Sequence, residues 1–132
     1  MFKSVASMPD VTSVYIGPAA MRFAQMSSVL DHDKVAADAV KSIKSLEVIE
    51  CDEQDRIPAV AAKAQAIIDE LKLEVILETK DDGEACVIYG LVSQKEPEYL
   101  ESLLIVSRDE DEYSLVYING KINIDELMED YR

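Results

Sequence analysis

The hydrophobic pattern of the chain changes its period near Leu73, and this change constrains the fold more than any other feature. Before it, apolar residues recur at helical spacing over 57–71 and form one stripe: Ile57, Val60, Ala61, Ala64, Ile67, Ile68 and Leu71. After it, apolar and charged residues alternate, which is the period of two that is typical of a strand. A helix with one apolar face followed by strands predicts a helix packed on a sheet.

Four strands are expected in the second half of the chain, over residues 73–78, 84–92, 99–107 and 113–118. Asp82-Gly83 predicts a type I′ hairpin turn, because both central positions of that turn need a positive φ. A polar loop over 93–97 and the acidic run 109–112 connect the later strands, and Asn119-Gly120 is interpreted as another turn. Asn123, with Glu126 three residues later, resembles the capping box of a C-terminal helix with its apolar stripe at Ile124, Leu127, Met128 and Tyr131.

The first half of the chain predicts two strands, over 11–16 and 45–51, separated by helices over 19–30 and 35–43. Gly17-Pro18 ends the first strand, and Pro18 suits the first turn of a helix, where its missing N–H costs nothing. The acidic turn 52–55 precedes the helix 57–71, where negative charge is favoured by the helix dipole. Residues 2–7 form either a short helix or a frayed arm.

This order of elements predicts an α+β fold in two layers, with a largely antiparallel sheet of five to six strands and helices packed on one face. Residues 1–132 are expected to form a single domain. The sequence leaves open whether the early strands include a parallel pair.

The charge of the chain excludes several classes of partner. It carries 13 basic and 27 acidic residues, a formal net charge of −14. Such a charge repels phosphate backbones and anionic lipid, so we expect no nucleic-acid and no membrane-surface role. No apolar run approaches the ~20 residues of a membrane span, and the first thirty residues lack the pattern of a secretory signal. Any export signal has therefore been removed or never existed.

The charge is unevenly distributed along the chain. Residues 1–44 are nearly neutral and contain four of the five methionines, whereas residues 45–132 carry almost all of the negative charge. Methionine and phenylalanine beside an acidic body suit a partner-binding face. The helical spacing of Met21, Phe23 and Met26 favours ordinary core positions for them, so residues 2–8 are the better prediction for an exposed apolar strip.

No catalytic or cofactor-binding residue is expected, and the chain is predicted not to be an enzyme. His32 is the single histidine and lies between two aspartates, which favours a solvated loop position over a role in a Ser-His-Asp or Cys-His arrangement. The four glycines are too scattered to form a phosphate-binding loop.

Cys51 and Cys86 both fall in predicted strands, and two alternatives remain open for them. In an exported protein they can form a disulfide that constrains a long loop. Otherwise they are two separate, half-buried thiols.

Three acidic clusters are candidate calcium-binding sites: residues 50–55, 81–84 and 109–112. None has the spacing and central glycine of an EF-hand loop. A solvated surface that resists aggregation is the favoured interpretation, with a weak divalent site at 109–112 as the alternative, so no metal ligand is assigned.

Several hydrophobic motifs lie around turns: residues 14–21 (VYIGPAAM), 45–49 (SLEVI), 103–106 (LLIV) and 116–124 (VYINGKINI). Together they resemble the DUF4252 family of exported bacterial proteins. The resemblance covers nearly the whole chain and implies a Gram-negative cell-envelope protein, periplasmic or an outer-membrane lipoprotein, whose signal peptide has been removed. It implies no activity, ligand or catalytic residue. The family usually has Ser-Lys where this chain has Gly17-Pro18, so a role for a lysine there is not carried over.

The function expected from the sequence is a non-enzymatic protein–protein interaction or structural module of the cell envelope, with an unknown protein partner there or a second copy of itself. A periplasmic protein that binds a small ligand or a divalent cation such as calcium is the alternative.

Overall fold

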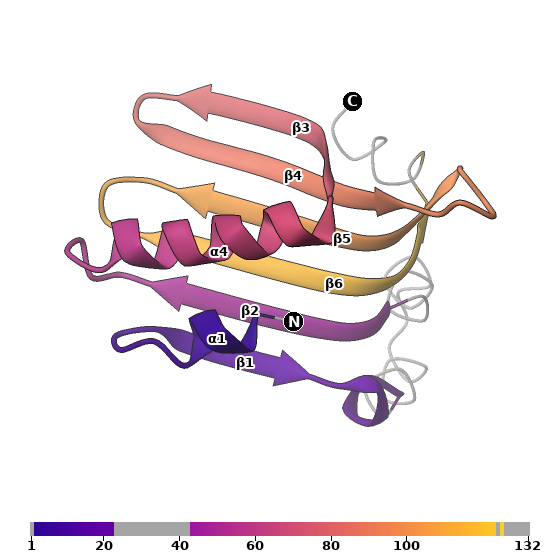
Figure 1. Cartoon of the computed structure of the whole chain (residues 1–132), viewed down its shortest axis with the longest axis horizontal. Helices are drawn as coiled ribbons and strands as arrows, with labels where there is room; N and C mark the ends of the chain where they lie inside the picture. The colour runs from indigo at the N-terminus through magenta and orange to yellow at the C-terminus, as the bar shows by residue number, and fades with distance from the viewer. Residues whose placement is uncertain (1, 23–42, 124, 126–132) are drawn as a thin grey trace, which may run out of the picture.

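The computed structural model describes residues 2–22, 43–123 and 125. Its strands form a sheet, and Figure 1 shows α1 and α4 in front of it. The helices are α1 (Lys3–Ala6) and α4 (Ile57–Leu71). The strands are β1 (Thr12–Ile16), β2 (Ile43–Cys51), β3 (Glu74–Asp81), β4 (Glu84–Val92), β5 (Tyr99–Arg108) and β6 (Tyr113–Asn123).

The strands form one open sheet in the order β1-β2-β6-β5-β4-β3, and every neighbouring pair in it is antiparallel. The predicted α+β class with an antiparallel sheet is therefore confirmed. The long connection from β2 through α4 to β3 leaves room beside β2, which β6 fills at the end of the chain. As a result, β1 and β3 form the two edges of the sheet (Figure 1).

The helix α4 packs on the sheet through the apolar stripe that the sequence predicts. Its buried residues are Ile57, Val60, Ala64 and Ile68. They join one core with Ile49, Leu104 and Leu115, side chains that β2, β5 and β6 present on the same face. Alanines in the stripe let the helix lie close to the strands. The helix ends at Lys72, whose φ of 56° places it in the left-handed conformation of a helix C-cap.

Residues 2–8 pack into this same core, so the predicted exposed apolar strip is wrong. Phe2 and Val5 have no exposed surface at all, and Met8 is half-buried against the core. The helical alternative for this segment is correct, since α1 covers residues 3–6. The segment joins the core because α1 lies beside α4 on the same face of the sheet, in front of β1 and β2 (Figure 1).

A second apolar cluster lies on the opposite face of the sheet. Ile88, Leu100 and Leu103 are its buried members, and Leu77, Ile105 and Ile118 are among the partly buried residues packed against them. These positions alternate along β4, β5 and β6 with the residues that face α4, as the period of two requires.

Turn predictions are confirmed at one hairpin and wrong at another position. Asp82 and Gly83 both have positive φ, 45° and 83°, and connect β3 to β4 as expected. Asn119 and Gly120, in contrast, lie inside β6, which continues to Asn123. The dipeptide lies at register shifts in the pairing of β6 with its neighbours and does not reverse the chain.

Several sequence predictions fall outside the described residues. These include His32, most of the helices predicted over 19–30 and 35–43, and most of the C-terminal helix. At their borders, residues 18–22 are helical with Met21 buried, whereas Ile43, predicted as the end of a helix, is the first residue of β2. The Asn123 side-chain carbonyl accepts a hydrogen bond from the Asp125 amide, as a helix cap does.

Candidate functional site

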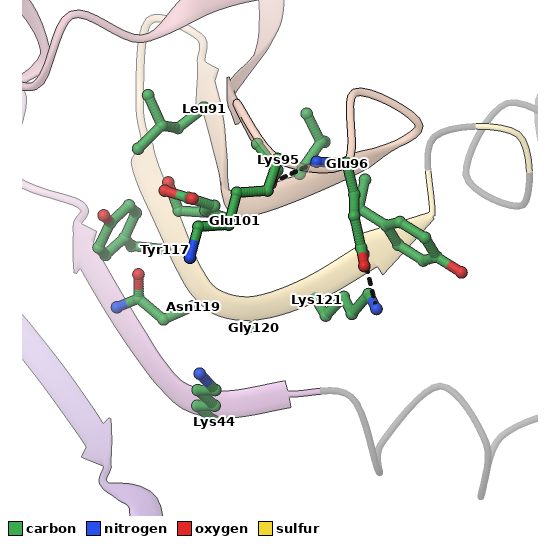
Figure 2. Close-up of a pocket in the computed structure, with 13 residues that line it drawn as sticks. Lys44, Leu91, Lys95, Glu96, Glu101, Tyr117, Asn119, Gly120 and Lys121 are labelled. Atoms are coloured by element: carbon green, nitrogen blue, oxygen red, sulfur yellow. Dashed lines mark hydrogen bonds and ion pairs between the residues drawn. The ribbon is translucent and has the colours of Figure 1, made fainter.

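A pocket of about 590 Å³ opens on the helix-covered face of the sheet, and Figure 2 shows the residues that line it. It lies at the end of the sheet where the strands extend past α4 in Figure 1. Its walls come from the start of β2, the end of β4, the loop over residues 93–98, the start of β5 and the end of β6. Tyr117 belongs both to the core beneath the helices and to the pocket lining, so the pocket continues the face on which α1 and α4 pack.

Two irregularities of the sheet meet at Gly120 and shape this pocket. On one side, the pairing of β2 with β6 shifts around Lys44, and on the other side the pairing of β5 with β6 shifts by one residue past Asn119. Gly120 itself is buried with a φ of 156°, a conformation that residues with a β-carbon rarely adopt. Bulges increase the local twist and bend of a strand, which hollows this end of the sheet.

Polar side chains form the floor of the pocket where the strand alternation calls for apolar ones. Asn119 on β6 and Ser102 on β5 line the pocket and are register partners. Ser45 on β2 is the register partner of Asn119 on its other side and lies next to the pocket lining. The Asn119 side-chain amide donates a hydrogen bond of 3.2 Å to the hydroxyl of Ser45, so this pair satisfies itself.

Ser102 differs from its neighbours because its hydroxyl has no hydrogen-bond partner within the described part of the chain. The residue is 2% exposed, and it lines the pocket. An unsatisfied buried hydroxyl costs about 1–3 kcal/mol, and such groups are rare in native proteins. The floor of the pocket therefore offers a donor and acceptor that the described protein groups do not use.

Three of the seven lysines in the described residues line the pocket: Lys44, Lys95 and Lys121. Lys121 is paired, since its ammonium lies 2.7 Å from a Glu96 carboxylate oxygen and 4.4 Å from the centre of the Tyr99 ring. The hydrogen bond to Glu96 raises the pKa of the Lys121 ammonium. Neither Lys44 nor Lys95 has an ion pair in the described part of the chain.

The comparison with protein families gives one match. The family model described as "Domain of unknown function (DUF4252)" matches residues 2–129. The chain belongs to the DUF4252 family. Comparisons of this DUF4252 chain with curated proteins and with solved structures find no match.

The cysteines of this DUF4252 chain are separate thiols, which resolves the two alternatives left by the sequence. Cys51 lies on β2 and Cys86 on β4, with β6 and β5 between them. Three strand spacings amount to about 14 Å, beyond the ~7 Å limit for the Cα atoms of a disulfide. They also face opposite sides of the sheet, since Cys51 belongs to the core under α4 and Cys86 to the second cluster.

The acidic clusters shape turns of the DUF4252 domain. A carboxylate oxygen of Asp109 accepts hydrogen bonds from the backbone amides of Asp111 and Glu112, at 2.8 and 2.7 Å, which orders the connection from β5 to β6. Asp111 also accepts a hydrogen bond from the Gln54 side chain. Among the described residues, no group of three or more His, Cys, Asp or Glu side chains is placed to hold a metal ion.

The exposed edge strand β1 is the second notable feature of the DUF4252 domain. Val14 and Tyr15 are 53% and 66% exposed, and β1 contains no charged residue. The other edge, β3, carries Glu74, Glu78, Lys80 and Asp81. Charged edges discourage pairing with another chain, and β1 lacks this protection.

The pocket residues were not predicted from the sequence. The available signal was the polar set Ser45, Ser102 and Asn119 at inward positions of otherwise apolar strands. It was hidden because Asn119-Gly120 was interpreted as a turn, which removed Asn119 from the sheet. In the described helices, no segment is long and apolar enough to cross a membrane.

Proposed function

We propose that this DUF4252 domain is a non-enzymatic binding protein of the cell envelope that takes up a small polar ligand in the pocket at Gly120. The observation that carries the proposal is the unpartnered hydroxyl of Ser102 in the pocket floor. The location in the envelope follows from what the family resemblance implies.

The buried Ser102 hydroxyl carries a free-energy cost. Leaving it unsatisfied destabilises the folded protein, so its persistence calls for a compensating role. A ligand that bonds to Ser102 recovers part of this cost, which makes binding more favourable by the same amount. The pocket volume of about 590 Å³ lies within the ~300–1,000 Å³ that small-molecule sites occupy.

A binding role fits these side chains better than catalysis. Among the described residues, no histidine or cysteine lines the pocket, and none is a base hydrogen-bonded to the Ser102 hydroxyl that would activate it as a nucleophile. The titratable groups in the lining are lysines, glutamates and tyrosines on its walls.

The test is a titration of the ¹⁵N-labelled chain with small polar compounds, followed in amide NMR spectra. We expect saturable shifts of the Ser102, Asn119 and Gly120 amides, and Ser102→Ala should weaken binding about threefold to tenfold. Ser107→Ala, an exposed serine further along β5, is the matched control. Shifts spread over the whole surface, or equal affinity for Ser102→Ala, would contradict the proposal.

A second candidate function rests on β1. We propose that its uncharged, exposed edge pairs with the same strand of a second copy, in line with the interaction module expected from the sequence. The near-neutral composition of residues 1–44 favours contact between copies at this edge over contact through the acidic remainder.

A further inference from the structure

We infer that the ligand of this pocket is a small hydroxylated organic anion, such as a sugar acid or sugar phosphate, whose charged group lies between Lys44 and Lys95. The inference rests on the proposed function and adds the chemical class of the ligand.

Lys44 and Lys95 approach the pocket from opposite sides. Lys44 lies at the bulge of β2, and Lys95 belongs to the loop between β4 and β5. Figure 2 shows the Lys95 side chain extending into the pocket toward Tyr117 and Asn119, while the Lys44 ammonium is directed at the pocket from β2. The two ammonium groups therefore flank the polar floor, where a carboxylate or phosphate can accept charge-assisted hydrogen bonds from both.

Lys44 and Lys95 are distinguished by their position at one pocket. Of the seven described lysines only Lys121 makes an ion pair, with Glu96, so the absence of a pair is common among them. Lys44 and Lys95 line one pocket and have no such partner in the described part of the chain. An anion bound from solution supplies the charge that the protein does not.

The pocket is also locally positive within an acidic protein. Its lining contains three lysines and two glutamates, whereas the whole chain carries −14. The surrounding negative field weakens long-range attraction of anions, so recognition depends on direct contact with the ammonium groups. We therefore expect affinity in the millimolar range that decreases as salt concentration rises.

Hydroxyl groups on the ligand follow from the remaining polar side chains. Glu101 lines the same pocket and has no ion pair among the described residues, so its carboxylate can accept hydrogen bonds from ligand hydroxyls. Ser102 offers both a donor and an acceptor. A simple inorganic anion uses the lysines alone, whereas a hydroxylated anion uses the lysines, Glu101 and Ser102 together.

The test compares ligands of similar size that differ in charge. The ¹⁵N-labelled full chain is titrated with gluconate and with glucose 6-phosphate, and separately with glucose and with sorbitol, at an ionic strength matched with KCl. A further titration uses inorganic phosphate. We expect the two hydroxylated anions to shift the Ser102, Asn119 and Gly120 amides saturably. The neutral compounds should bind at least tenfold more weakly, and phosphate should lie in between.

Variants of Lys44 and Lys95 test whether these two lysines contact the anion. Lys44→Gln and Lys95→Gln should each weaken gluconate binding at least about threefold, and the double variant at least tenfold. Both residues are on the pocket rim, so folding should be preserved, which the dispersion of the amide spectrum checks. Lys63→Gln removes the same charge from the exposed face of α4 and should leave binding unchanged.

The outcomes separate the inference from the function on which it rests. If glucose or sorbitol binds as tightly as the anions, or if the pocket variants behave like Lys63→Gln, the anionic class is wrong and the pocket remains a site for neutral ligands. If phosphate alone binds as tightly as gluconate, the hydroxyl contacts to Glu101 and Ser102 are wrong. If none of the compounds shifts the pocket amides, both proposals are overturned.

Discussion

Glu47 fixes the first described residue of the chain: its two carboxylate oxygens lie 3.2 and 3.3 Å from the Phe2 backbone nitrogen, which donates to both. The carboxylate is buried on β2 beneath α1. The ring of Phe2 meets Tyr117 edge to face, with centroids 5.2 Å apart. A buried carboxylate is costly unless its oxygens are bonded, so the position of α1 and the identity of residue 47 depend on each other.

Truncating the side chain of either Phe2 or Glu47 should therefore destabilise the fold. We expect Phe2→Ala to lower the free energy of unfolding by about 3 kcal/mol, because the side chain is fully buried and leaves a cavity. Glu47→Ala should cost about 1–3 kcal/mol by leaving a buried amide unsatisfied. Urea denaturation measures both, with Ser4→Ala on the exposed side of α1 as control. A change below about 0.5 kcal/mol in both variants would show that α1 does not contribute to the core.

Ser102→Ala should act in the opposite direction on stability. Deleting an unsatisfied buried hydroxyl removes its desolvation cost, so we expect the unliganded protein to gain about 1 kcal/mol. Ser45→Ala is the matched control, because it removes the acceptor of the Asn119 amide and should cost about 1 kcal/mol. Thermal and urea denaturation compare the two. A loss of stability in Ser102→Ala would mean that the hydroxyl has a structural role, and the argument for a ligand site would lose its basis.

The two sheet edges give a matched pair of variants for the second candidate function. Val14 on β1 and Val75 on β3 are 53% and 55% exposed. In an antiparallel β1–β1 pair centred on Val14, Val14→Lys places two like charges opposite each other, which is unfavourable. We expect Val14→Lys to weaken self-association at least tenfold in sedimentation velocity, and Val75→Lys to leave it unchanged.

Salt provides a second readout for that pairing. Two copies of a chain with a net charge of −14 repel each other, and screening by salt reduces this repulsion. Association through β1 should therefore strengthen as ionic strength rises. A wild-type chain that stays monomeric at millimolar concentration in high salt would eliminate the edge-pairing function.

Stability at alkaline pH should depend on Tyr113. Burial and, to a lesser extent, the nearby Tyr89 together raise the pKa of its phenol to about 12, with Arg108 partly opposing the shift. The folded state then holds the phenolic proton more tightly than the unfolded chain, whose tyrosine pKa is about 10. The stabilisation from the neutral phenol is complete below pH 10 and is lost as pH rises to 12. One proton over this range corresponds to about 2–3 kcal/mol.

Urea denaturation between pH 8 and 12 measures this slope. Tyr113→Phe should lose less stability than the wild type over pH 10–12, whereas Tyr15→Phe on the exposed edge strand should follow the wild type. Burial also raises the pKa of Tyr89, so only the difference between the wild type and Tyr113→Phe is assigned to Tyr113. Equal slopes in all three proteins would contradict the assignment.

Local periodicity in the sequence was sufficient for most of the elements. The stripe from Ile57 to Leu71 predicts α4, and its buried residues are the ones the spacing selects. The alternation after Leu73 and the Asp82-Gly83 turn predict the β3–β4 hairpin. These features depend on residues close in sequence, so the sequence of each segment is enough to predict its secondary structure.

The sequence predictions fail where the structure of a segment is determined by contacts with residues far away in the sequence. Phe2 is buried because Glu47 and Tyr117, far along the chain, provide its contacts. Asn119-Gly120 has the composition of a turn but lies inside β6, because pairing with β2 and β5 on both sides holds the strand extended through two bulges.

By itself, the amino-acid order determined the class of fold, the helix α4, the hairpin from β3 to β4 and the family motifs, because these follow from repeats a few residues long. Only the tertiary structure decided that β6 lies between β2 and β5, that the two cysteines stay apart, and that Asn119 and Ser102 line one pocket. The reason is physical: strand order and bulges are set by the balance of hydrogen bonds and burial over the whole sheet.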